Sequence, residues 1–220
     1  MKLEDVKKVE LGIFPTPLQR MTNLEKEIGV QNLYIKRDDM TDIGLSGNKI
    51  RKLEYLIKEA VDQKCDTLLT FGGPQTNHGR LVASAAVRCN MKSILVLDGE
   101  RPEYASGNII LDEMLGSDLY FVGDKNKDEL VKEIIEKYEQ NGRKVYTIPV
   151  GGSNTTGAVG YVNMVKELME QIEDMNINPK YIVTACGSMG TFCGIWAGIK
   201  YYKAPFEVIP VAVNPLTNFR

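Results

Sequence analysis

The chain has 220 residues, of which 43% are hydrophobic and 25% are charged, and its formal net charge is -2. This length allows one large domain or two small ones, and the composition is that of a globular protein, not of a disordered, collagen-like or coiled-coil chain. Because Lys and Arg do not exceed Asp and Glu, binding to nucleic acid is not expected.

The first ten residues alternate charges and contain no apolar run, so no secretory signal is predicted. No apolar stretch is long enough to span a bilayer, and we expect a cytoplasmic protein without a membrane partner. The four cysteines lie far apart and only one histidine accompanies them. Neither a disulfide framework nor a metal site is therefore expected.

Strand-like and helix-like segments alternate along the chain. Apolar, β-branched runs predict strands at 33–36, 67–71, 93–97, 119–122, 145–148, 181–185 and 208–213. Apolar residues at helical spacing predict a helix from Ile50 to Ala60, and further helices at 127–140 and 161–172. This alternation predicts an α/β fold in which parallel sheets are flanked by helices.

Small-residue loops follow three of these strands, at 72–77, 151–154 and 187–191. Ligands of open α/β sheets bind at the carboxyl ends of the strands. Glycine lets the backbone approach a ligand, and the free N–H groups of a helix start attract anions. One such loop is more often only a turn. Three loops in one chain, all rich in Ser, Thr or Asn, favour a ligand site.

A lysine stands where the first long helix opens. Ser46 or Asn48 is expected to cap this helix, and Lys49, Arg51 and Lys52 all lie in its first turn. The helix dipole and the neighbouring charges disfavour the ammonium form, which pushes an amine towards the neutral state that a Schiff-base lysine requires. The alternative is that Arg51 and Lys52 form a solvated face, as expected for at least one of them.

Four blocks together resemble the D-cysteine desulfhydrase and aminocyclopropane-carboxylate deaminase family of pyridoxal-phosphate enzymes, of fold type II. The blocks are SGNKIRKLEYL at 46–56, GGPQTNHGR at 72–80, GGSN at 151–154 and CGSMGT at 186–191. The resemblance implies two open, twisted, mostly parallel sheets flanked by helices. It also implies a smaller inserted domain at 47–159 and a larger cofactor-binding domain at 1–46 plus 160–220.

The resemblance assigns roles to matching positions. Lys49 would bind pyridoxal 5'-phosphate through its amine and then move the α-proton, with Thr76 as the second catalytic residue. Asn77 would hold the ring hydroxyl. The phosphate loop would consist of Gly187, Ser188, Met189, Gly190 and Thr191. The substrate would be bound by Gln75, Thr76, Asn77, Ser153 and Asn154.

Three features depart from the family pattern. Thr76 stands where many relatives have Ser, which puts opening of a cyclopropane ring in doubt. Met189 occupies a position where a small residue is usual, so its side chain must point away from the phosphate. The family's partner for the pyridine nitrogen lies beyond residue 220, so we expect an incomplete C-terminal part and an exposed edge strand at 208–213.

The function expected is a pyridoxal-phosphate lyase that removes a β-leaving group from a small amino acid such as D-cysteine, giving pyruvate, ammonia and sulfide, and acting as a homodimer. The alternatives are an aminocyclopropane-carboxylate deaminase, another β-eliminating lyase such as a cysteate sulfo-lyase, and a cofactor-binding fragment without turnover. β-Replacement is a weaker enzyme hypothesis. A serine hydrolase using Ser188 and His78 would need Gly in place of Cys186.

Overall fold

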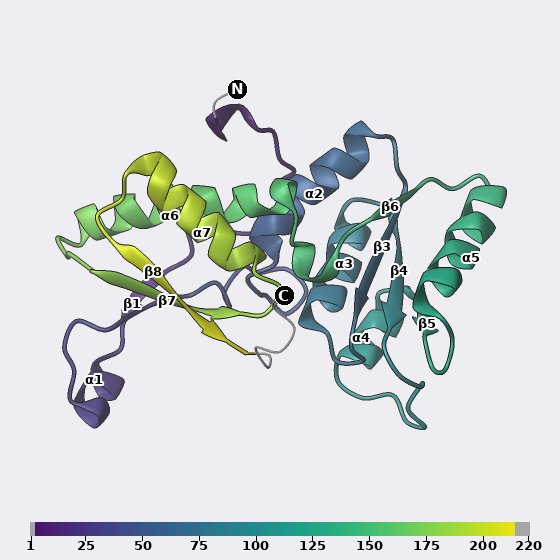
Figure 1. Cartoon of the computed structure of the whole chain (residues 1–220), viewed down its shortest axis with the longest axis horizontal. Helices are drawn as coiled ribbons and strands as arrows, with labels where there is room; N and C mark the ends of the chain where they lie inside the picture. The colour runs from purple at the N-terminus through teal and green to yellow at the C-terminus, as the bar shows by residue number, and fades with distance from the viewer. Residues whose placement is uncertain (1–2, 214–220) are drawn as a thin grey trace.

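The computed structural model describes residues 3–213, and Figure 1 shows two groups of strands with helix α2 between them. One group is a four-stranded parallel sheet with the order β5-β4-β3-β6. Its strands are β3 (Thr67–Gly72), β4 (Lys92–Leu97), β5 (Asp118–Phe121) and β6 (Val145–Thr147). They are connected by α3 (Asn77–Arg88), α4 (Asn108–Met114) and α5 (Lys127–Gln140).

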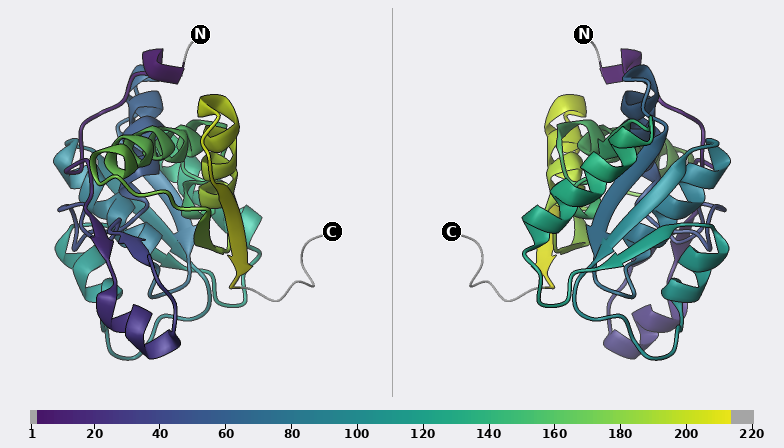
Figure 2. Two further views of the ribbon diagram at one scale, coloured as in Figure 1. Left: turned by 90° about the vertical axis from the view of Figure 1, so that its left-hand side faces the viewer. Right: turned by 90° about the vertical axis from the view of Figure 1, so that its right-hand side faces the viewer.

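The second group contains a parallel pair, β7 (Tyr181–Cys186) and β8 (Glu207–Ala212), joined through α7 (Gly190–Tyr202). Figure 2 shows β8 at the margin of the molecule. Nearby, β1 (Leu18–Arg20) and β2 (Tyr34–Lys36) form an antiparallel pair around α1 (Thr22–Ile28). The predicted α/β fold with parallel sheets and flanking helices is confirmed, whereas β1 was not predicted because its three residues carry no apolar pattern.

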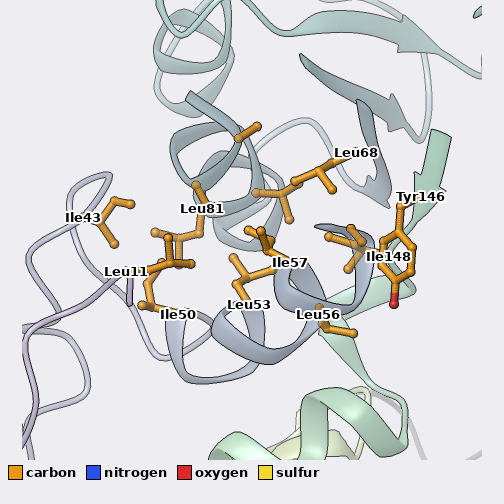
Figure 3. Close-up of a cluster of buried hydrophobic side chains, with 14 of the residues drawn as sticks. Leu11, Ile43, Ile50, Leu53, Leu56, Ile57, Leu68, Leu81, Tyr146 and Ile148 are labelled. Atoms are coloured by element: carbon orange, nitrogen blue, oxygen red, sulfur yellow. The ribbon is translucent and has the colours of Figure 1, made fainter. Parts of the chain in front are cut away.

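Apolar side chains alternate between the two faces of the four-stranded sheet, which explains its continuous apolar strands. Leu68 belongs to a core that α2 (Ile50–Asp62) and α3 complete, and Figure 3 shows this cluster. Leu69 faces a second core against α5. A third core lies between α6 (Thr155–Asp174) and α7 and includes Tyr161 and Ile195.

Helix α2 contacts both groups, because its apolar stripe meets the first core while its other side meets α6. Gly160 permits the crossing of α2 and α6, since a Cβ at this position would collide with the backbone carbonyl of Arg51. The two remaining short helices are η1 (Leu3–Asp5) and η2 (Val150–Gly152). The helix that begins directly after the candidate lysine thus packs against other elements on two sides.

The division into a domain at 47–159 and a second domain from the flanking segments stays a prediction. The four-stranded sheet lies wholly inside the first range, and the third core draws all of its residues from the second. Within residues 3–213, no helix combines the length and the apolar character that crossing a membrane requires.

Candidate active site

The loop of η2, the start of α2 and the loop after β7 come together at one place. A Cβ on Gly151 would lie 2.5 Å from Ser188 Oγ and 3.6 Å from Lys49 Cε. Gly151 has φ +64°, so only glycine combines this backbone conformation with this close approach. A cavity of about 330 Å³ opens there, and Lys49, Gly187, Ser188, Met189 and Thr191 are among the residues that line it.

Lys49 is the residue immediately before α2, and its side chain is half-buried. Its Nζ donates to Asn48 Oδ1 at 2.9 Å, and burial lowers the pKa of the amine. The predicted cap is wrong: neither Ser46 nor Asn48 caps α2, because Ser46 Oγ instead accepts from the backbone N–H of Asp42. Backbone carbonyls take the place of a side-chain cap: the N–H of Ile50 donates to Gly47 at 3.3 Å, and the N–H of Lys52 donates to Lys49 at 3.0 Å.

Lys52 lies one turn further along α2 and is completely buried. Its Nζ donates to the carbonyl of Gly151 at 3.0 Å and to Ser153 Oγ at 3.4 Å. Burial, followed by the charge of Lys49, lowers its pKa to about 7. A Cβ on Gly190 would lie 2.8 Å from this Nζ, so the amine reaches the start of α7.

The expectation of a solvated face is wrong for both Arg51 and Lys52. Arg51 is buried and donates to Asp38 at 2.8 Å and to Glu167 at 2.8 and 2.9 Å. Lys52 was not among the residues predicted for the site, although its i, i+3 spacing from Lys49 places both amines on one helix face. That spacing was the available signal.

The loop between β7 and α7 forms another wall of the site, and Gly190 at its end lies next to Lys52. Ser188 Oγ and Ser153 Oγ share a hydrogen bond of 2.7 Å, which joins two loops that were predicted to serve different ends of the ligand. Met189 has φ +61° and precedes the first residue of α7 without a side-chain cap. Asn154, predicted to bind substrate, caps α6 through the N–H of Gly157 at 2.8 Å.

The loop after β3 carries Gln75 and Thr76, and Asn77 is the first residue of α3. Thr76 Oγ1 caps α3 by accepting from the N–H of Gly79 at 3.2 Å. Gln75 uses its side chain on the loop before α4, accepting from the N–H of Asn108 and donating to the carbonyl of Ser106. Thr76 therefore has a hydroxyl proton left to donate, while Gln75 has both ends of its amide occupied.

His78 is buried behind this loop and hydrogen-bonds Thr70 Oγ1 at 2.9 Å. Burial, together with the nearby charges of Lys49 and Lys52, lowers its pKa to about 3. Because Ser188 pairs with Ser153 and His78 with Thr70, the nucleophile and base of a hydrolase are not assembled.

This donor set fits pyridoxal phosphate. Among the described residues, the hydrogen-bond partners of Lys52 Nζ are neutral oxygens, so its charge has no bound counter-ion. A buried amine beside the N-terminus of α7, together with the hydroxyls of Ser153 and Ser188, matches the needs of a phosphate. Lys49 adds a second amine with a lowered pKa, and it lines the cavity beside the 187–191 loop. No group of His, Cys, Asp and Glu suited to a metal ion occurs within residues 3–213.

Comparison with known proteins gives consistent matches. Residues 9–220 match the family described as pyridoxal-phosphate dependent enzyme. A putative 1-aminocyclopropane-1-carboxylate deaminase of Pyrococcus abyssi is 36% identical over 96% of this chain and 64% of its own length. The bifunctional D-cysteine desulfhydrase/1-aminocyclopropane-1-carboxylate deaminase, mitochondrial, of Arabidopsis thaliana is 40% identical over 93% of this chain and 54% of its own length.

A crystal structure of an ACC deaminase homologue superposes with a TM-score of 0.89 at 37% identity, covering 99% of this chain and 66% of that chain. The present chain thus spans between about half and two thirds of the length of these proteins.

Proposed function

Because this chain belongs to the family of pyridoxal-phosphate dependent enzymes, we propose that it provides the cofactor-binding part of a β-eliminating amino acid lyase. The reaction proposed for D-cysteine breaks the Cα–H and Cβ–S bonds and, with water, gives pyruvate, ammonia and hydrogen sulfide. The observation that carries the proposal is that Lys49 and Ser188 line one cavity and both lie against Gly151, whose carbonyl accepts from the buried amine of Lys52.

Lys49 is proposed as the residue that binds the cofactor and then moves the α-proton. Its Nζ is half-buried beside Asn48, and burial lowers its pKa, which raises the fraction of neutral, nucleophilic amine. When bound, pyridoxal phosphate supplies a sink for the electron pair left at Cα. The neutral amine of Lys49 would then take the proton from this carbon, and that proton would leave with the departing sulfide.

The phosphate end is proposed to lie at 187–191 with Lys52. Backbone N–H groups at the start of α7 and the hydroxyls of Ser188 and Thr191 donate, and Lys52 supplies the positive charge. Ser153 hydrogen-bonds Ser188, so we propose Ser153 at this end as well. Binding of a phosphate would keep Lys52 protonated at neutral pH, because an opposite charge favours the ammonium form.

The substrate carboxylate is proposed to bind at the start of α3. Thr76 Oγ1 already accepts from Gly79, so its own O–H is the group that donates to the substrate. Asn77 is proposed to hold the ring oxygen of the cofactor. The roles of Gln75 and Asn154 in substrate binding stay predictions, as do the homodimer and the cytoplasmic location.

Labelling of Lys49 tests the cofactor assignment. The chain is loaded with pyridoxal phosphate, reduced with borohydride and mapped by peptide mass spectrometry. We expect the label on Lys49, its loss in Lys49→Ala, and its retention in Lys58→Ala, a lysine on the outer face of α2. A label on another lysine contradicts the proposed site.

A keto-acid assay tests the activity. D-cysteine, D-serine, L-cysteate and 1-aminocyclopropane-1-carboxylate are compared at equal concentration. Turnover of D-cysteine above the ring compound supports the elimination; the reverse order favours a deaminase, as the name of the Pyrococcus abyssi relative suggests. Cofactor uptake with no keto acid from any of the four contradicts the lyase and leaves a binding fragment.

Substitution of Thr76 separates the substrate end from the cofactor end. Thr76→Ala is expected to lower kcat/KM about tenfold or more, because a hydrogen bond to a charged group contributes about 1.5–3 kcal/mol. It also removes the cap of α3, which costs about 1 kcal/mol of folding stability. Thr76→Ser keeps both contacts and serves as the matched control. Unchanged turnover in Thr76→Ala excludes Thr76 from the site.

A further inference from the structure

The amide of Asn77 is held from one side by two donors. Asn77 is the first residue of α3, and its Oδ1 accepts from Asn108 Nδ2 at 3.0 Å and from Arg80 Nη2 at 3.3 Å. Within residues 3–213 these are its side-chain hydrogen bonds, so Nδ2 of Asn77 remains available as a donor.

Chemistry fixes which end of this amide faces the two donors. A guanidinium can only donate, so the Asn77 atom that faces Arg80 is an oxygen. Asn108 Nδ2 also donates to the backbone carbonyl of Gln75 at 2.9 Å, and a carbonyl can only accept. The Asn108 atom that faces Asn77 is therefore a nitrogen, and the same orientation of Asn77 follows from both neighbours.

Both donors are themselves held in place. The backbone N–H of Asn108 donates to Gln75 Oε1 at 2.8 Å, and Gln75 Nε2 donates to the carbonyl of Ser106 at 2.9 Å. Gly107 has φ +55°, and a Cβ there would collide with Gln75 Oε1.

Arg80, the second donor, is buried. It donates to the carbonyls of Gly44 and Ser46, two residues in the loop that precedes Lys49.

We propose that Asn108 and Arg80 are positioning residues that hold the Asn77 amide so that its Nδ2 donates to an anionic ring oxygen of the cofactor. The inference rests on the proposed function. A donor favours the ionised form of the oxygen it faces, so the pair would keep the ring hydroxyl deprotonated. Gln75 acts on Asn77 through its contacts with Asn108.

Cofactor binding measured in a double-mutant cycle tests the inference. Asn108→Asp has the same shape but cannot donate, so it repels Asn77 Oδ1 and favours the flipped amide. We expect the Kd for pyridoxal phosphate to rise about tenfold or more in this variant, as for loss of a hydrogen bond to a charged group. In an Asn77→Ala background the same change is expected to alter Kd less than about twofold, because coupled sites are non-additive.

A spectral titration separates positioning from a general loss of structure. The visible band of the bound cofactor is followed against pH, and its midpoint is expected to move upward in Asn108→Asp and in Asn77→Asp. Asn141→Asp, which removes a similar amide donor to the carbonyl of Lys137 on α5, is the matched control and leaves Kd and midpoint unchanged. Thermal unfolding without cofactor identifies a variant that fails to fold, and Asn108→Ala then takes its place in the cycle.

Two results would overturn the inference while the proposed function stands. Either Asn108→Asp binds pyridoxal phosphate with the wild-type Kd, or Asn108→Asp raises the Kd by the same factor in the Asn77 and Asn77→Ala backgrounds. If the wild-type chain takes up no pyridoxal phosphate, the proposed function fails first and the inference fails with it.

Discussion

Lys49 and Lys52 are chemically identical residues one helical turn apart, and their environments separate them. Lys49 opens into a cavity, whereas Lys52 is enclosed by Gly151, Ser153 and Gly190. An isolated buried ammonium is unfavourable, which explains the downward pKa shifts of both amines. The fold therefore tolerates a cost at Lys52 that a bound anion would offset.

Lys52 is expected to make stability depend on pH. Its pKa is about 7 in the folded chain and about 10.5 unfolded, so between these values the unfolded state binds more protons. Stability then rises with pH across this window, by at most about 1.4 kcal/mol per pH unit from this residue. Urea unfolding at pH 7.5 and pH 9 measures the difference.

Lys52→Met is the comparison for that slope, because it keeps the length and removes the charge. The variant is expected to show a smaller rise in free energy of unfolding between the two pH values. An equal rise in both proteins would show that Lys52 is not the group that titrates. Inorganic phosphate is expected to stabilise the wild type more than the variant.

Met189 holds a backbone conformation that favours glycine. Its φ of +61° costs a non-glycine residue about 1–2 kcal/mol. Met189→Gly is therefore expected to be more stable than Met189→Ala by about 1 kcal/mol in chemical unfolding. At Glu133, an exposed position inside α5, the same pair is expected to give the opposite order, since Gly is the poorer helix former. Equal stabilities at 189 would refute the strain.

At the scale of elements, three segments are joined by one buried guanidinium. Arg51 on α2 pairs with Asp38, just after β2, and with Glu167 on α6. Tyr161 Oη also donates to Asp38, and Lys36 pairs with Glu167. Burying charges in this way adds little to net stability because of the cost of desolvation, but removal of one partner is destabilising.

Arg51→Met is expected to lower the free energy of unfolding by about 3–5 kcal/mol, because it leaves Asp38 and Glu167 buried with less compensation. Arg37→Met, which breaks an exposed pair with Asp39, is expected to cost less than about 1 kcal/mol. Chemical unfolding of both variants decides the matter. If the two variants lose similar amounts of free energy of unfolding, the ion pairs of Arg51 are screened by solvent like those of a surface pair.

At the scale of the whole molecule, the β7–β8 pair has one covered and one uncovered face. Ile182 and Val208 pack on the core of α6 and α7. Val183 and Ile209 are register partners on the opposite face, and 67% and 42% of their surfaces are exposed. The predicted exposed edge at this strand is confirmed, because β8 pairs with β7 alone among the described strands.

Exposed apolar pairs on an open sheet favour association. We expect the chain to self-associate at micromolar concentrations, and Val183→Lys with Ile209→Lys to reduce this. Sedimentation velocity measures the effect, with Val87→Lys, an exposed residue on α3, as the control. Association that persists in the double variant would place the contact elsewhere.

The sequence by itself determined the order of strands and helices, because periodicity records which residues each element buries. The helix predicted at 127–140 is α5 with the same bounds, and seven of the eight strands found within residues 3–213 were predicted. Residue blocks likewise indicated the family and its cofactor. The helix-capping role of Thr76 on α3 was not predicted from the sequence, because a threonine hydroxyl can cap a helix or bind a ligand equally well.

Only the tertiary structure showed that the amine of Lys52 belongs to the site and which way the Asn77 amide is oriented. Lys52 contacts Gly151, which is 99 positions away, and Asn108 contacts Asn77 across 31 positions. A polar residue on a helix is exposed by default, and it becomes buried only if another element covers that face. Periodicity within one helix carries no information about that covering element, so these contacts arise only when the chain folds.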